Sequence, residues 1–108
     1  MSDAVRPITQ MTRPARLDVS RCARPEYPRA ALRSGAEGAT TIRFTVDAAG
    51  RVTDARVAQR SGATREHRLM DRAAIEALSQ CRFSPGTDAR GRPVGGQTTV
   101  EYVWRLID

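Results

Sequence analysis

The sequence has no lysine, only one histidine and only two cysteines among its 108 residues. The cysteines lie far apart and neither belongs to a Cys-x-x-Cys pair, so a structural zinc site is excluded. The single histidine, His67, is flanked by Glu66 and Arg68 at the start of an expected helix, where we expect it to be solvated. No paired carboxylates, nucleophile–base set or phosphate-binding glycine loop is present. We therefore expect no enzyme activity, no catalytic residues, no metal and no cofactor.

Aromatic residues and long apolar runs are also scarce. The chain has one tryptophan, two tyrosines and two phenylalanines. No run approaches the roughly 18 apolar residues of a membrane-spanning helix, and no basic-then-apolar signal peptide opens the chain. We expect these residues to form a soluble domain, with any targeting segment outside them.

The charge balance is strongly basic. The chain has 18 arginines and 12 acidic residues, which gives a net charge of +6 and a sequence pI near 10.9. One interpretation is a polyanionic partner, such as nucleic acid or an anionic membrane surface. The other is a coding preference for arginine with ordinary solvation. The arginines never stand side by side and few aromatics are available for base stacking, so the second interpretation is favoured.

The length allows one domain, and a hydrophobic content of 40% suits a small globular core. Residues 1–20 show no sustained hydrophobic period and contain two prolines, which is typical of a flexible tail or the end of a linker. We place the domain at residues 21–108.

Hydrophobic periodicity divides this domain into two helices and three strands. Pro28 opens a short helix with Ala31 and Leu32 on its buried side, and residues 66–81 have the 3.6-residue period of a longer helix. Alternation in 41–47 and 100–106 predicts half-buried strands, and Trp104 falls on the apolar face of the latter. A tight turn at Asp47–Gly50 leads into a return strand from Val52, with a β-bulge near Asp54. The glycine-rich stretch 84–96 is expected to be a long connection.

These elements predict an α+β fold. Strands one and two form an antiparallel hairpin, and the long helix carries the chain to strand three beside strand one. The result is a three-stranded antiparallel or mixed sheet of order 2-1-3, with two helices packed on one face. Strand three then has a free edge, and such an edge can bind an extended peptide by β-strand addition.

An ordered set of short motifs resembles the TonB C-terminal domain family. Pro25–Ala31 (PEYPRAA) resembles its PxYPxxA opening, and 42–52 (IRFTVDAAGRV) resembles its first strand and Asp-x-x-Gly-Arg-Val turn. Residues 81–86 (CRFSPG) and 91–94 (GRPV) resemble its Trp-Arg-Phe-x-Pro box and the Gly-Lys-Pro-Val that follows. Cys81 stands where the family often has an aromatic residue. The resemblance covers roughly residues 22–107.

The resemblance implies a periplasmic domain whose full-length protein is anchored to the inner membrane. Such a protein couples an inner-membrane, proton-driven motor of the ExbB/ExbD type to outer-membrane receptors, for example in siderophore uptake, by binding their TonB box. The alternative is a TolA-like or paralogous cell-envelope adaptor that uses the same edge, and a nucleic-acid binder is the remaining candidate. Strand three could also pair with its own copy in a homodimer. The expected partner-binding residues are Arg24, Glu26, Tyr27, Thr98, Thr99, Val100, Glu101, Tyr102, Val103 and Arg105.

A periplasmic location also makes a disulfide possible between Cys22 and Cys81. Cys22 just precedes the first expected helix and Cys81 ends the second, and both helices are expected on one face of the sheet. The alternative is two buried thiols. We expect the disulfide.

Overall fold

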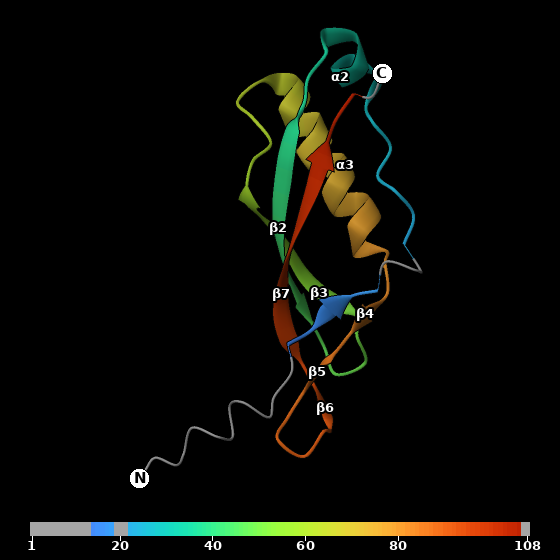
Figure 1. Cartoon of the computed structure of the whole chain (residues 1–108), viewed down its shortest axis with the longest axis vertical. Coiled ribbons are helices and arrows are strands. Elements are labelled where there is room, and N and C mark those ends of the chain that lie inside the picture. Colours follow the sequence, from blue (N-terminus) through green and yellow to red (C-terminus); the bar gives the residue numbers. More distant parts are fainter. Residues whose placement is uncertain (1–13, 19–21, 107–108) are drawn as a thin grey trace.

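A three-stranded antiparallel sheet organises the domain (Figure 1). The computed structural model describes residues 14–18 and 22–106. The central strand β2 (Gly38–Val46) lies between β3 (Val52–Gln59) and β7 (Gly96–Trp104), and both pairings are antiparallel. The predicted order is confirmed, because β3, β2 and β7 are the second, first and third predicted strands.

Helix α3 (Arg65–Ser79) covers one face of this sheet, and α2 (Arg29–Ser34) packs against α3 (Figure 1). Thr64 caps the start of α3, because its side-chain oxygen accepts a hydrogen bond from the His67 backbone N–H. His67 is not simply solvated as expected: its Nδ1 lies 2.7 Å from Thr64 Oγ1 and its Nε2 lies 2.9 Å from the Glu37 carbonyl oxygen. In the described residues, neither helix has the length and apolar character needed to span a membrane.

The core lies between the sheet and α3, and it follows the predicted alternation. The largest fully buried side chains belong mainly to β2 and α3, and they are Phe44, Phe83, Ile42, Met70, Val46 and Thr40. Ala31 is fully buried, but the prediction that Leu32 is buried beside it is wrong, since Leu32 is 48% exposed. Helix α2 has only six residues, less than two turns, so only a narrow stripe of it reaches α3.

The hairpin between β2 and β3 turns at Asp47. Asp47 Oδ1 accepts hydrogen bonds from the backbone N–H groups of Ala49 and Arg51, both at 2.9 Å. Gly50 has φ +84°, and a side chain there would collide with the carbonyl of Phe83. The bulge expected near Asp54 is confirmed, because Thr53 has no partner in the register. A second register shift, which the sequence did not reveal, leaves Ala58 unpaired.

The connection after α3 is more ordered than expected. It contains β4 (Phe83–Ser84) and a short hairpin formed by β5 (Gly86–Thr87) and β6 (Pro93–Val94). The turn of this hairpin, at Asp88, repeats the turn at Asp47: Asp88 Oδ1 accepts from the backbone N–H groups of Arg90 and Arg92.

The stretch 14–18, inside the predicted tail, is part of the fold. Strand β1 (Arg16–Leu17) pairs antiparallel with β4, and Ala15 is 1% exposed. The chain therefore already contacts the domain before the expected boundary at residue 21, and the rest of the 1–20 segment lies outside the described residues.

The predicted disulfide is present: Cys22 is bonded to Cys81, with their Cα atoms 4.7 Å apart. Cys81 lies just beyond α3 and is buried, whereas Cys22 is only partly buried. The bond fastens the start of the segment leading to α2 to the far end of α3.

Candidate functional site: the outer edge of β7 and its groove

The outer edge of β7 is open. Strand β7 pairs with β2 through nine successive residue pairs without a register shift, from Gly38 opposite Trp104 to Val46 opposite Gly96. Within the described part of the chain, no strand pairs with its other side. Ala15 lies close to Gly96 at the start of the strand. The predicted free edge is therefore present in the structure.

The backbone groups that β7 presents on this edge follow from the pairing of β2. The Thr45 carbonyl accepts a hydrogen bond from Thr53 Oγ1, so Thr45 faces β3. Backbone groups alternate sides along a strand, which turns the even-numbered residues of β2 toward β7. Their partners in β7 are also even-numbered. The N–H and C=O groups of Gln97, Thr99, Glu101 and Val103 consequently point away from the sheet, where a peptide can bind them.

The opposite edge of the sheet, on β3, is less suited to binding a strand. Two register shifts interrupt β3, and Asp54 and Arg56 on it form an ion pair at 3.0 Å. Bulges and charged side chains are the usual means by which proteins prevent strand addition at an edge. Strand β7 has no bulge against β2, and Glu101 is its one charged residue. Of the two edges, β7 is the one open to a partner.

The segment before α2 contributes Tyr27, which is half-buried against the end of β7. Its ring lies edge-on to the Trp104 ring at 5.0 Å, and its hydroxyl donates a hydrogen bond to the Ala36 carbonyl. Burial, together with the nearby Glu37 and Tyr102, raises the pKa of the Tyr27 phenol above its usual value. Tyr27 therefore holds the segment against the sheet, and its predicted contact with a partner is restricted to its exposed part.

A buried chain of hydrogen bonds fixes the end of β7. Trp104 is 2% exposed, and its indole Nε1–H donates to Thr40 Oγ1 at 3.0 Å. The Thr40 hydroxyl donates to Asp71 Oδ1 at 2.7 Å, and the Ser61 backbone N–H donates to the same oxygen at 3.0 Å. These hydrogen bonds join β7, β2, α3 and the residues that follow β3. They agree with the predicted structural role of Trp104, because they link the end of β7 through Thr40 to Asp71 on α3.

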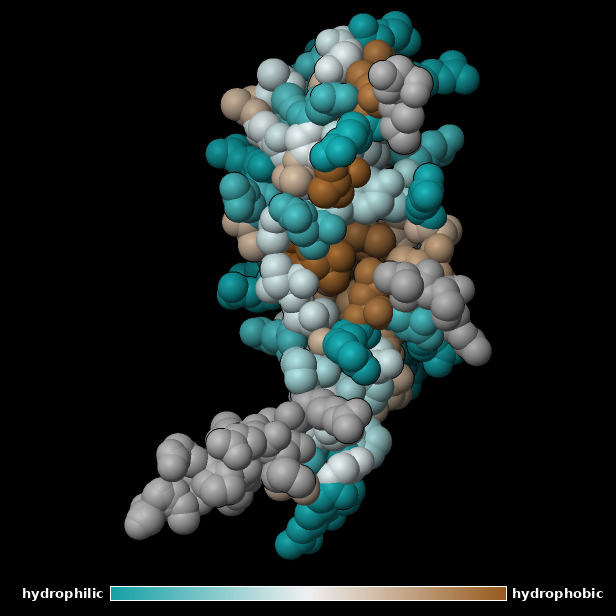
Figure 2. Space-filling model, viewed as in Figure 1, coloured by the Kyte–Doolittle hydropathy of each residue, from teal (hydrophilic) through white to brown (hydrophobic). Residues whose placement is uncertain are grey.

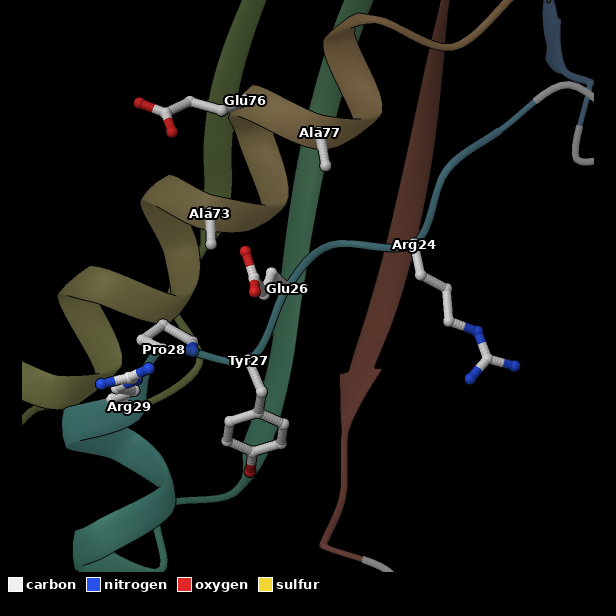
Figure 3. Close-up of a pocket in the computed structure, with 8 residues that line it drawn as sticks. All are labelled: Arg24, Glu26, Tyr27, Pro28, Arg29, Ala73, Glu76 and Ala77. Atoms are coloured by element: carbon white, nitrogen blue, oxygen red, sulfur yellow. The ribbon is translucent and has the colours of Figure 1, made fainter.

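A first hollow, of about 610 Å³, lies between α3 and the segment that precedes α2, which contains Arg24, Glu26 and Tyr27 (Figure 3). On the α3 side, the small side chains of Ala73 and Ala77 leave the space open. In Figure 3, Glu26 points toward the helix, whereas Arg24 points away from it, on the side of β7. Both side chains are exposed. Two of the predicted partner-binding residues thus lie on different sides of the segment.

A second hollow, of about 350 Å³, lies between the segment and β7, and we call it the groove. It brings Arg24 together with three of the predicted β7 residues, Val100, Glu101 and Tyr102. The rest of its lining was not predicted as part of the site and consists of Leu17, Cys22, Ala23, Pro25 and Leu78. No local pattern marks these five residues, because only the fold brings them together.

The other predicted residues lie along β7 or beyond it. The side chains of Thr99 and Val103 are exposed and that of Thr98 is half-buried, while Arg105 follows the last residue of the strand. Among the residues that the structure describes, no group of three or more His, Cys, Asp or Glu side chains could hold a metal ion. What this edge and groove can do chemically is bind an extended chain through main-chain hydrogen bonds and enclose some of its side chains.

The fold and this edge define a small α+β domain that presents one strand and an adjoining groove to a partner. A family model described as the Gram-negative bacterial TonB protein C-terminal matches residues 23–106. The chain belongs to this family of TonB C-terminal domains.

Individual relatives agree with this assignment. The chain is 36% identical over 82 residues to the protein TonB of Xanthomonas campestris pv. campestris (strain B100). The aligned stretch covers 76% of this chain and 34% of that protein. The chain thus spans about a third of the length of the curated relatives that it matches.

Solved structures show the same fold. The solution structure of the Pseudomonas aeruginosa TonB C-terminal domain superposes with a TM-score of 0.66 at 28% identity, covering 87% of this chain and 88% of that one. The Helicobacter pylori TonB C-terminal domain superposes with a TM-score of 0.55 at 25% identity, covering 78% and 71%.

Proposed function

We propose that this chain is the periplasmic C-terminal domain of a TonB-like energy transducer, and that it binds the TonB box of outer-membrane receptors by adding it as a strand to the outer edge of β7. In the full-length protein the domain is anchored to the inner membrane. It transmits the work of an ExbB/ExbD-type, proton-driven motor to receptors that import substrates such as siderophores.

One observation carries this proposal: in a domain of the TonB family, four residues of β7 have N–H and C=O groups that no strand of the described part of the chain pairs with. Each hydrogen bond to a peptide contributes about 0.5–1.5 kcal/mol net. Ordering the peptide offsets much of that gain, so we expect dissociation constants in the micromolar range. The same edge pairing with a second copy of the chain would compete with the peptide.

The test is a titration with synthetic peptides taken from the periplasmic N-termini of the outer-membrane receptors encoded in the same genome. Glu101→Pro removes an N–H that points outward and that β2 does not use, so this variant should fold and lose binding at least tenfold. Glu101→Ala is the matched control, since it removes the same side chain but keeps the N–H, and it should bind much more tightly than Glu101→Pro. Undiminished binding by a folded Glu101→Pro variant, checked by circular dichroism, contradicts strand addition at β7.

A further inference from the structure

The groove lies where one face of an added strand would come to rest. A strand paired with β7 would run about 4.8 Å beyond it, with side chains alternating between the two faces of the sheet. Those on the helix side would share the face of Val100 and Tyr102, which both line the groove. In Figure 2, apolar side chains gather beside a hollow in the middle of this face of the molecule.

The lining of the groove is apolar at its base and polar only at its rim. Leu78 from α3 is 4% exposed and forms the base, and Leu17 is packed against the same core. Ala23 and Pro25 form the wall on the side of the segment. The charged side chain at the rim is that of Arg24, which is exposed, while the Glu101 side chain lies on the opposite face of the strand from Val100 and Tyr102. Such a lining favours an apolar side chain and disfavours a charged one at the base, where no polar group would receive it.

The disulfide holds one wall of the groove in position. Cys22 lines the groove and begins the segment that forms its wall, while Cys81 follows Leu78 by three residues at the end of α3. The covalent bond therefore joins the wall to the element that supplies the base. Without it, the start of the segment loses its direct attachment to α3.

We infer that the groove is a subsite for one side chain of the bound peptide. The added strand has one face on the same side of the sheet as Val100 and Tyr102, and the groove receives an apolar side chain from that face. The Cys22–Cys81 disulfide keeps the groove formed. This inference rests on the proposed function, because it needs a strand on β7. It names the class of peptide that the edge prefers, one that is apolar at alternate positions on a single face.

The probe is a pair of acetylated heptapeptides in which threonine alternates with a guest residue, either leucine or serine at every guest position. The leucine peptide should bind the oxidised domain about tenfold more tightly than the serine peptide, as expected for burying one aliphatic side chain. Ala23→Glu, at an exposed position of the wall, should fill the groove and bring the two affinities within about twofold. Ala48→Glu, the same change at an exposed position of the β2–β3 turn outside the groove, is the matched control and should keep the preference.

Removing the disulfide by substitution tests its role. The Cys22→Ala/Cys81→Ala variant, with its fold confirmed by circular dichroism, should lose most of the leucine preference while still binding both peptides. Equal binding of the leucine and serine peptides to the parent domain, with Glu101→Pro abolishing both, overturns the subsite and leaves strand addition intact. Binding of both peptides that Glu101→Pro does not weaken overturns strand addition itself, and the subsite with it.

Discussion

Trp104 contributes to this domain through its ring contacts and its indole N–H. Its ring is in edge contact with the rings of Tyr27 and Tyr102, with ring centres at 5.0 and 4.8 Å, and its Nε1–H donates a hydrogen bond to Thr40. Thr40 is itself fully buried and passes the hydrogen-bond chain on to Asp71. The only tryptophan of the chain is thus committed to the interior and stabilises the strand whose opposite edge is open.

Trp104→Ala should lower the free energy of unfolding by about 3–5 kcal/mol, the usual cost of emptying a large buried aromatic site. Trp104→Phe should cost less, because it keeps most of the packing and removes the indole N–H. Urea denaturation followed by circular dichroism measures both differences. If Trp104→Ala kept the parent's midpoint, the tryptophan would have no structural role and its burial would need another explanation.

At the level of elements, the two hairpin turns have the same construction. Asp47-Ala48-Ala49-Gly50-Arg51 and Asp88-Ala89-Arg90-Gly91-Arg92 both place an aspartate that accepts two backbone N–H groups, and a glycine with positive φ three residues later. In each turn the backbone N–H of the closing arginine is the main cause that lowers the aspartate pKa below its usual value. Both carboxylates therefore favour the folded state when they are ionised.

The lowered pKa values of Asp47 and Asp88 determine in which direction the stability of the domain changes with pH. A carboxyl group whose pKa is lower in the folded than in the unfolded chain stabilises the fold above its unfolded pKa of about 4, and this contribution disappears as the pH falls through the folded value. The parent domain should accordingly lose stability below about pH 4. An Asp47→Asn/Asp88→Asn variant cannot titrate at these positions, so its urea midpoint should fall less than that of the parent between pH 5 and pH 2.5. Parallel midpoint curves for the two proteins would contradict this account.

The periodic elements were predictable from local sequence, and the contacts between them were not. Alternation at Ile42, Phe44 and Val46 correctly identified the inner face of β2, because the strand has one buried and one exposed side. The β5–β6 hairpin was missed although its Asp-x-x-Gly-Arg turn repeats the one recognised at Asp47, since its strands are only two residues long and show no alternation. The groove was missed for another reason: Leu17, Ala23 and Leu78 meet only after folding.

For the whole molecule, the disulfide closes a loop across 59 positions of the chain. Closing a loop of this length removes conformational entropy from the unfolded chain, which stabilises the fold by about 4 kcal/mol in the chain-entropy model. The Cys22→Ser/Cys81→Ser variant should show a loss of this size in its free energy of unfolding, and the parent protein should show a similar loss in dithiothreitol. The variant itself is the control for the reductant, since its midpoint should not respond to dithiothreitol.

The same covalent loop sets the path of mechanical tension through the domain. The covalent path from the chain ahead of Cys22 to strand β7 runs through the sulfur–sulfur bond to Cys81, so tension cannot pull the residues enclosed between the two cysteines out to their full length. Strands β2 and β3 and both helices are enclosed in this way. The part of this path that is free to lengthen is the short stretch from Arg82 to Gly95, which contains β4, β5 and β6. In the oxidised protein, stretching between these two points can therefore lengthen the domain only by this stretch, and force on β7 reaches β2 through their nine residue pairs.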